Sequence, residues 1–315
     1  MKAAIRTAYG LPDVLRVGEV NVPIPKDNEM LVKVHATTVN RSDYHVLTGK
    51  PFIMRLFTGL TKPRLSITGS DFSGEIEATG KNVKLFKSRD KVVGFIDMGA
   101  KSHAQYLVIP ETKVIRAPSN VTYQEAAACL EGAFYAFSGI QKVKPKAEQK
   151  ALVIGATGAI GSSYVQFLKV HDVNITAVCR SQNSQLVKFL GARRIIDYET
   201  EDFTKDLEQY DFIFDAVGKS TFRKCKHLLK LKGIYTSSQP NVIEALVTPL
   251  LGGKKVIFPI PKNLMASLVS IRALVESGSF KPVIDREYPL DKIADAYRYV
   301  ATGQKIGNVI INMDA

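Results

Sequence analysis

The chain has 315 residues, of which 45% are hydrophobic, and carries a formal net charge of +13. Because a single core seldom grows beyond about 250 to 300 residues, this length predicts more than one domain. No run approaches the ~18 uncharged apolar residues of a transmembrane helix, and residues 1–6 lack the apolar core of a signal peptide.

The positive charge does not indicate a nucleic-acid-binding protein. The 43 Lys and Arg residues are spread over the whole chain, without the interleaved aromatic residues that a stacking platform needs. Most of this charge is therefore expected on a solvated surface. The three cysteines, Cys129, Cys179 and Cys225, are far apart and form no Cys-x-x-Cys pair, which predicts reduced thiols and a cytoplasmic protein.

Residues 1–115 predict a small β-rich domain. Short apolar runs alternate with turns, and prolines divide the section into pieces too short for helices; the runs are residues 31–36, 73–78, 91–96 and 105–109.

The pattern changes near residue 123. An alanine-rich helix at 124–130 precedes a series of apolar strands separated by helical stretches; the strands are residues 151–154, 175–179, 195–198, 211–217, 233–236 and 255–258. This alternation predicts an α/β fold with a doubly wound parallel sheet. A last helix, 290–302, leads to a strand at 308–313 that is expected to rejoin the first domain. We place the domains at 1–122 completed by 286–315, and at 123–285.

The glycine-rich turn after the strand at 151–154 predicts a dinucleotide site. Gly155 permits a tight turn, Gly158 lets a pyrophosphate approach the backbone, and Gly161 lets the following helix lie close to the sheet. The diphosphate would lie at the helix N-terminus. The other residues of this turn expected near it are Thr157, Ala159 and Ile160. The alternative is a plain helix-capping turn.

The residue after the next strand distinguishes the two dinucleotides. NAD-specific sites carry a carboxylate there, whereas the 2′-phosphate of NADPH needs positive charge. Here the strand ends at Arg180 and Ser181, and no carboxylate stands at that point. A guanidinium pairs well with a phosphate, so we predict NADPH; the alternative is a solvated surface arginine.

Several blocks resemble the zinc-independent medium-chain dehydrogenase/reductases, which include quinone oxidoreductases and zeta-crystallin-like proteins. The resemblance covers nearly the whole chain and is carried by residues 39–43, 68–76, 88–94, 155–161, 190–198 and 303–311. It implies a GroES-like catalytic domain built from both chain ends, an inserted Rossmann domain, and a cleft between them.

Zinc-dependent relatives differ from this chain at two expected ligands. They have a cysteine where this chain has Asn40, and Gly-His-Glu where it has Gly69, Ser70 and Asp71. Catalytic zinc needs three converging nitrogen, sulfur or carboxylate ligands, and the five histidines show no ligand spacing. We therefore predict no metal. Without a Lewis acid, an acceptor that is already electrophilic is favoured, such as a quinone or an α,β-unsaturated ketone or aldehyde.

The resemblance also implies catalytic residues. Asn40 matches an active-site asparagine whose amide donates to a substrate carbonyl, and Tyr44 or His45 would orient the substrate or relay a proton. For Asn40 and Asp43 the equal alternative is a hydrogen-bonded pair that closes a loop.

Further coenzyme contacts are carried over from relatives by position. Tyr198 matches a tyrosine near the 2′-phosphate or adenosine, and Phe134 replaces a threonine beside the nicotinamide; Val217 and Gly218 are expected near the adenosine, and Thr236 and Ser237 near the nicotinamide.

Three functions remain open: an NADPH-dependent quinone or enone reductase, a zinc-free alcohol or carbonyl oxidoreductase, and a non-catalytic NADPH-binding protein. The first is favoured, with a small-molecule substrate and no membrane or specific nucleic-acid partner. Residues 50–64 and 248–263 are expected to line the pocket, but carry no motif that identifies the substrate. Residues 255–260 look like an apolar sheet edge, which predicts a homodimer.

Overall fold

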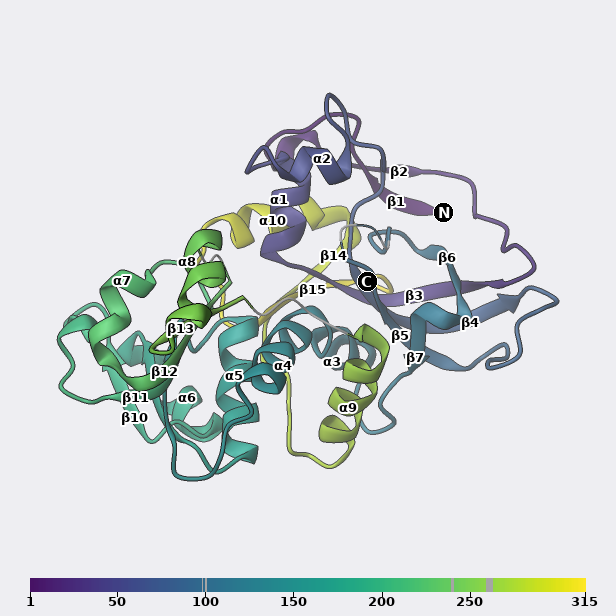
Figure 1. Ribbon diagram of the computed structural model, residues 1–315. Helices are drawn as coiled ribbons and strands as arrows, with labels where there is room; N and C mark the ends of the chain where they lie inside the picture. The colour runs from purple at the N-terminus through teal and green to yellow at the C-terminus, as the bar shows by residue number, and fades with distance from the viewer. Residues whose placement is uncertain (98, 100, 239–240, 259–262) are drawn as a thin grey trace. The chain divides into compact units, whose positions relative to one another are not determined.

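The protein divides into two compact units in the computed structural model, which describes residues 1–315 except 98, 100, 239–240 and 259–262 (Figure 1). Unit 1 comprises Met1–Glu131 and Val283–Ala315, and unit 2 comprises Gly132–Pro282. The predicted division at residue 122 assigned the helix that follows to the second domain, whereas its contacts lie in unit 1 because it packs on the sheet there.

Unit 1 is built on a seven-stranded sheet in the order β14-β15-β3-β4-β5-β7, with β6 paired to β3. These strands are β3 (Glu29–Val39), β4 (Asp71–Thr79), β5 (Lys91–Phe95), β6 (Tyr106–Pro110), β7 (Val114–Arg116), β14 (Ile284–Pro289) and β15 (Asn308–Asn312). Among the strands described for this sheet, only β14 and β15 pair in parallel. The C-terminal strand β15 pairs antiparallel with β3. A separate two-stranded sheet joins β1 (Lys2–Ile5) to β2 (Arg16–Glu19).

The helices of unit 1 are short: α1 (Arg41–Thr48), α2 (Met54–Thr58), α3 (Tyr123–Ala128) and α10 (Ile293–Ala301). Helix α10 buries Ile293, Ala296, Tyr297 and Val300, the i, i+3, i+4, i+7 stripe of a helix facing a core. The expectation that residues 1–115 hold no helix was wrong for both α1 and α2. No proline occurs between Pro25 and Pro51, and the Asp43 carboxylate accepts a hydrogen bond from the Asn40 N–H at 2.8 Å, which caps the helix start.

Unit 2 is a doubly wound sheet of six parallel strands in the order β10-β9-β8-β11-β12-β13, as the alternating pattern predicted. The strands are β8 (Lys150–Ile154), β9 (Asn174–Cys179), β10 (Arg194–Asp197), β11 (Tyr210–Asp215), β12 (Leu229–Ser237) and β13 (Lys255–Ile257). The chain reverses its direction of winding at β8, so this order is that of a dinucleotide-binding Rossmann sheet. The helices between strands are α4 (Glu131–Val143), α5 (Ala159–Val170), α6 (Ser184–Leu190), α7 (Phe222–Cys225), α8 (Val242–Val247) and α9 (Leu264–Glu276).

Two predicted elements end earlier than expected. The helix predicted at 124–130 breaks after Ala128, and a new helix begins at Glu131. The strand predicted at 211–217 ends at Asp215, because the Asp215 carboxylate accepts hydrogen bonds from the amides of Val217 and Gly218 at 3.2 and 2.8 Å and so closes a turn.

Candidate active site and coenzyme site

The glycine turn of unit 2 has the geometry that a dinucleotide needs. Gly155 has a φ of +76°, and a Cβ added to Gly161 would lie 2.1 Å from the Gly155 carbonyl oxygen. A Cβ on Gly158 would meet only that oxygen, at 3.7 Å. Gly155 is therefore required by the turn and Gly161 by close packing of helix on strand, whereas the backbone at Gly158 is open to an approaching group.

The turn delivers the chain to the N-terminus of α5. Gly158 is the N-cap, with φ −72° and ψ 170°, and the helix starts at Ala159 and Ile160. First-turn N–H groups have no acceptor within their own helix and bind anions. Thr157 and Ile160 are half-buried and Ala159 is buried. This end of the sheet fits a pyrophosphate.

The carboxylates beside Arg180 were missed in the sequence. The Nε of Arg180 lies 2.9 Å from Glu199 Oε1, and its guanidinium is 6.0 Å from the centre of the Tyr198 ring. Ser181 donates its backbone N–H to Asp197 Oδ2 at 3.1 Å. Residues 197–199 reach this point because β10 pairs in parallel with β9, which places Asp197 opposite Cys179. No carboxylate directly follows β9 in the sequence, but the pairing of β10 with β9 brings Asp197 and Glu199 beside Ser181 and Arg180. The prediction that this point lacks a carboxylate was therefore wrong.

The remaining predicted coenzyme residues differ in accessibility. Tyr198 and Val217 are 50% and 40% exposed, whereas Phe134, Thr236 and Ser237 are buried. Gly218 lies in the turn closed by Asp215, which also accepts the Ser220 N–H at 2.9 Å. Asp215 was not predicted, and its role is to shape the loop after β11.

Asn40 lies at the centre of a buried polar cluster in unit 1. Its side-chain Nδ2 lies 2.6 Å from Thr38 Oγ1, 3.1 Å from Glu131 Oε2 and 3.3 Å from Asp71 Oδ2. Its backbone N–H donates to Asp43, as the loop-closing alternative expected. The amide that was predicted to donate to a substrate carbonyl is thus directed at carboxylates of the protein itself.

Three carboxylates share this cluster, which we call the buried carboxylate cluster: Asp43, Asp71 and Glu131. The Ser70 hydroxyl lies 3.0 Å from Glu131 Oε2 and 3.2 Å from Asp43 Oδ1, and Ser42 donates to the other oxygen of Glu131. Asp71 accepts hydrogen bonds from the Thr38 amide and hydroxyl at 2.9 and 2.7 Å. Because Ser70 has a single hydroxyl hydrogen, it can donate to only one of these two carboxylates at a time.

Burial and mutual repulsion favour the protonated forms of these acids. Burial, followed by the charge of Asp71, raises the pKa of Glu131 to about 7. Burial raises the pKa of Asp71 to about 6. The pKa of Asp43 is raised well above its ordinary value by burial and by Glu131. Nearby, burial lowers the pKa of Lys305 to about 8, against the opposing attraction of Glu131.

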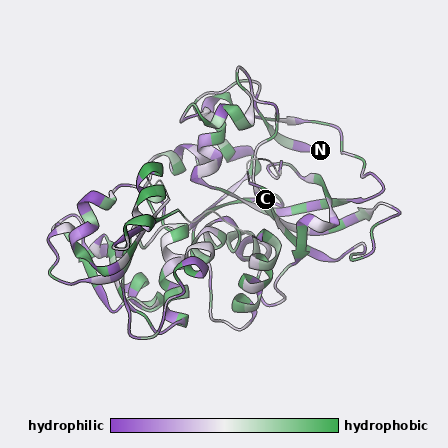
Figure 2. Ribbon diagram, viewed as in Figure 1, coloured by the Kyte–Doolittle hydropathy of each residue, from purple (hydrophilic) through white to green (hydrophobic). Residues whose placement is uncertain are grey.

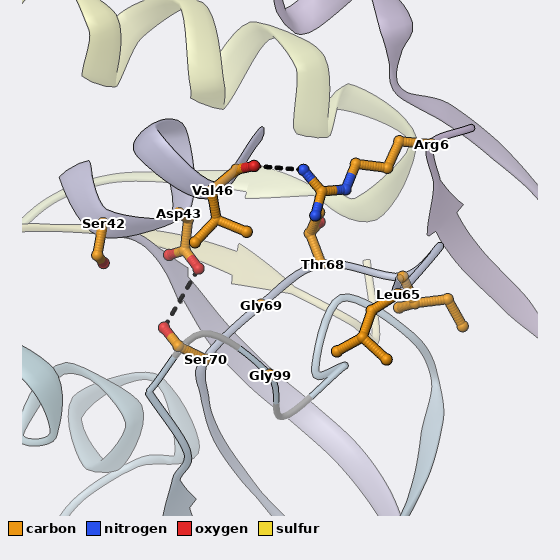
Figure 3. Close-up of a pocket in the computed structure, with 10 residues that line it drawn as sticks. Arg6, Ser42, Asp43, Val46, Leu65, Thr68, Gly69, Ser70 and Gly99 are labelled. Carbon is orange, nitrogen blue, oxygen red and sulfur yellow. Dashed lines mark hydrogen bonds between the residues drawn. The ribbon is translucent and has the colours of Figure 1, made fainter. Parts of the chain in front are cut away.

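A small cavity of about 10 Å³ adjoins the cluster (Figure 3). Its volume suits a single water molecule and is too small for a nicotinamide ring or a quinone. In Figure 3, Ser70 points toward Asp43, and Arg6 reaches the backbone carbonyl of Val46. The lining residues are Arg6, Ser42, Asp43, Val46, Leu65, Ile67, Thr68, Gly69, Ser70 and Gly99.

Tyr44 and His45 do not line this cavity. Tyr44 packs against the hydrophobic core of unit 1. Burial lowers the pKa of His45, so its neutral form is favoured. Their roles toward a substrate stay predictions.

Sequence reasoning missed Glu131, His103 and Tyr297 in this region. His103 is buried, with its ring nitrogens 2.8 Å from Thr68 Oγ1 and 2.9 Å from the Thr38 carbonyl oxygen. Glu131 lies 91 residues from Asn40, and no local pattern marks that pairing. Among the described residues, no group of three or more His, Cys, Asp and Glu side chains is placed to hold a metal ion.

A Rossmann sheet joined to a β-rich unit is typical of nicotinamide-dependent oxidoreductases, and comparison with known proteins identifies the family. Residues 26–119 match the alcohol dehydrogenase GroES-like domain, and residues 190–311 match the zinc-binding dehydrogenase family. The chain belongs to the medium-chain dehydrogenase/reductases of the quinone oxidoreductase type.

Curated relatives match along almost the whole chain. It is 31% identical to 2-methylene-furan-3-one reductase of Solanum lycopersicum, over 99% of this chain and 79% of that protein. It is 30% identical to the chloroplast envelope quinone oxidoreductase homolog of Arabidopsis thaliana, over 93% and 92%. The quinone oxidoreductase from Coxiella burnetii shares the fold, with a TM-score of 0.89, 23% identity and 99% coverage of both chains. No helix among the described residues is long and apolar enough to span a membrane.

Proposed function

We propose that the protein is an NADPH-dependent reductase that transfers hydride to a conjugated carbonyl, a quinone or an α,β-unsaturated ketone or aldehyde, without zinc. The observation that carries this proposal is that Asn40 and Ser70 both donate hydrogen bonds to Glu131. Asn40 and Ser70 stand where the resemblance places zinc ligands in other family members, and here they form a hydrogen-bonded network within the protein.

This donor set does not fit catalytic zinc. Of the three residues only Glu131 offers a preferred zinc ligand, since zinc takes thiolate, imidazole or carboxylate. The Asn40 Nδ2 is a donor, turned toward two carboxylates. Without a Lewis acid the protein has no means here of lowering the pKa of an alcohol, so a polarised, conjugated acceptor suits it better.

NADPH is the coenzyme best supported by the chain's own residues. The glycine turn offers backbone to a pyrophosphate, and Arg180 with Tyr198 offers a cation and a ring beyond it. The pair with Glu199 lowers the net charge near Arg180, so the preference over NADH is expected to be moderate. A bound nicotinamide supplies the hydride, and the chain supplies binding, orientation and exclusion of water.

The names of relatives agree with this substrate class. One relative, 28% identical, is the NADPH-dependent alkenal/one oxidoreductase of Arabidopsis thaliana, and two named above are an enone reductase and a quinone oxidoreductase homolog. The test is a panel of quinones, enones, enals, saturated ketones and alcohols, with NADPH oxidation or NADP⁺ reduction followed by absorbance. Steady NADPH oxidation with a conjugated acceptor supports the proposal. Turnover confined to alcohols, or tight NADPH binding without turnover on any acceptor, contradicts it.

We also propose a symmetric dimer formed through the edge of the unit 2 sheet. β13 is the edge strand, and next to it α8 exposes Val242, Ile243 and Leu246 at 69%, 71% and 68%. Figure 2 shows α8 as a largely hydrophobic ribbon. An unpaired apolar edge invites pairing with a second copy. Pro259 and Ile260, part of the predicted edge, lie outside the described residues. Light scattering at micromolar concentration should give twice the monomer mass, and a monomer would contradict the proposal.

A cytoplasmic location is part of the same proposal. It is supported by the three cysteines, which are all free and buried, as expected where thiols stay reduced.

A further inference from the structure

A second exposed apolar surface lies in unit 1, on and around α2 (Figure 1). Five large side chains there are more than half exposed; these are Phe52 at 65%, Ile53 at 58%, Leu56 at 54%, Phe57 at 62% and Leu60 at 57%. We call this group the α2 surface. Scattered exposed apolar residues are ordinary, but five within nine consecutive positions mark an interaction site.

The α2 surface is held in place by the rest of unit 1. The Tyr9 hydroxyl lies 2.6 Å from the Gly59 carbonyl oxygen and 2.8 Å from Thr58 Oγ1. The Arg55 guanidinium lies 4.7 Å from the centre of the Tyr9 ring, and the Arg64 N–H donates to the Thr58 carbonyl at 2.8 Å. The backbone is thus anchored on its inner side, and the exposed side chains follow from that anchoring.

All formal charge in this part of the sequence is positive. Residues 44–70 contain Lys50, Arg55, Lys62 and Arg64 and not one Asp or Glu. Lys50, Lys62 and Arg64 are exposed. Aromatic and aliphatic side chains flanked in the sequence by basic residues complement the interface of an anionic bilayer, where the apolar groups enter the acyl boundary and the cations meet lipid phosphates.

The two exposed apolar surfaces differ in the kind of partner that each could bind. The surface on α8 adjoins β13, whose open backbone edge suits another copy of the chain. The α2 surface is carried by a helix that packs on α1 and is anchored to Tyr9, and its excess of cations would repel a second α2 surface. We propose that the α2 surface docks the protein on anionic lipid membranes as a peripheral, reversible contact. This inference does not depend on the coenzyme, and it assigns residues 52–60, which the sequence predicted to line the substrate pocket, to a membrane contact instead.

The chain contains no tryptophan, so Phe57→Trp introduces a single tryptophan reporter into these 315 residues. With vesicles of phosphatidylcholine containing phosphatidylserine, its emission should shift to the blue and be quenched by brominated lipid. Phe189→Trp is the matched control, because Phe189 is 77% exposed on α6, in unit 2. No shift at Phe57, or an equal shift at both positions, overturns the proposal.

Sedimentation with the same vesicles tests the two components of binding. Phe52→Ser with Phe57→Ser should weaken binding at least about ten-fold, since each buried apolar side chain contributes strongly. Lys62→Gln with Arg64→Gln should weaken it by about five-fold per charge, and added salt should act likewise. The control is the pair Lys26→Gln with Lys81→Gln, which lowers the net charge by the same amount at positions away from α2.

Two results would overturn the proposal in this assay. Because the whole chain is basic, binding that survives the serine pair and falls equally in both glutamine pairs would show attraction by net charge alone. A change of oligomeric state in the serine pair, with vesicle binding intact, would assign the α2 surface to self-association. Circular dichroism of each variant confirms that it is folded, and the NADPH affinity should equal that of the wild type.

Discussion

Arg180 can make two competing interactions. Its Nε lies 2.9 Å from Glu199 Oε1, with the side chain 33% exposed. That N–H is not aligned for a hydrogen bond with Glu199, so the contact is an ion pair and a weak one at this exposure. A coenzyme 2′-phosphate, with more charge and three oxygens, is a better partner for a guanidinium.

Arg180→Ala should therefore weaken NADPH binding selectively. Loss of a charge-assisted pair costs on the order of 1.5 to 3 kcal/mol, or about 10- to 150-fold in affinity, whereas NADH affinity should barely change. Glu199→Gln should strengthen NADPH binding several-fold, because it removes the competing anion. Fluorescence titration of both coenzymes measures these changes. Arg193→Ala, at the other end of β10, is the control, and equal losses for NADPH and NADH in Arg180→Ala would assign Arg180 to the fold.

The buried carboxylate cluster makes stability depend on pH with a definite sign. The pKa of Glu131 rises from its ordinary 4.5 to about 7 on folding. Between these values the folded protein binds more protons than the unfolded chain, so its stability falls as pH rises through that window. Asp71, whose pKa rises to about 6, acts in the same direction. His103 acts oppositely, because burial lowers its pKa to about 4 and stability from this group grows as pH rises toward 6.5.

Glu131→Gln should flatten this dependence. The free energy of unfolding of the variant, relative to the wild type, should increase between pH 5 and pH 8 by on the order of 1 to 3 kcal/mol. Comparing the two proteins at each pH cancels the opposing contribution of His103. Urea unfolding at four pH values provides the measurement, with the exposed Glu77→Gln as control. Parallel profiles for the wild type and Glu131→Gln would show that Glu131 is already ionised at pH 5.

At the scale of an element, two glycines of the glycine turn have different roles: Gly161 is needed for folding and Gly158 for coenzyme binding. In Gly161→Ala the new methyl would lie 2.1 Å from the Gly155 carbonyl oxygen, so strand and helix must move apart. In Gly158→Ala the nearest atom is 3.7 Å away, and φ is −72°, a value that alanine adopts freely. One substitution strains the fold, and the other fills only the side from which a pyrophosphate approaches.

We expect Gly161→Ala to lower the free energy of unfolding by about 1 to 3 kcal/mol. Gly158→Ala should unfold like the wild type but bind NADPH and NADH at least about ten-fold more weakly, because both carry the pyrophosphate. Thermal unfolding and coenzyme titration together distinguish the two effects. Unchanged coenzyme binding in Gly158→Ala would place the diphosphate elsewhere.

The elements that the sequence predicted well are those whose signals are local. Strand β8, the glycine turn and α5 follow one another, and apolar runs with turn residues mark their limits. The element boundaries that were predicted wrongly depended on single side-chain hydrogen bonds to backbone amides two or three residues away. Asp215 ends β11 through its own turn, and α1 starts where the Asp43 side chain caps it. Neither hydrogen bond can be read from hydrophobic periodicity.

Across the whole molecule, the site was harder to predict than the fold. The family resemblance directed attention to Asn40 and Asp43, but the partner that defines their environment, Glu131, lies 91 residues from Asn40. Likewise Glu199 reaches Arg180 only through the pairing of β9 and β10. Candidate residues could be read from the sequence, but the charges that face them come from a helix and a strand far away along the chain.

The metal content of the purified protein tests whether this chain works without zinc, which other members of its family use. Asn40 and Ser70 are engaged with Glu131, at 3.1 and 3.0 Å, and binding zinc there would break these hydrogen bonds. Among the described residues, no three His, Cys, Asp or Glu side chains are placed to supply the three ligands that catalytic zinc needs. We expect well under one zinc per chain by elemental analysis, and NADPH-dependent turnover unchanged after prolonged treatment with a chelator. Added zinc should not raise the rate. Stoichiometric zinc together with turnover that a chelator abolishes and zinc restores would show that this cluster rearranges into a metal site, and would return saturated alcohols and ketones to the candidate substrates.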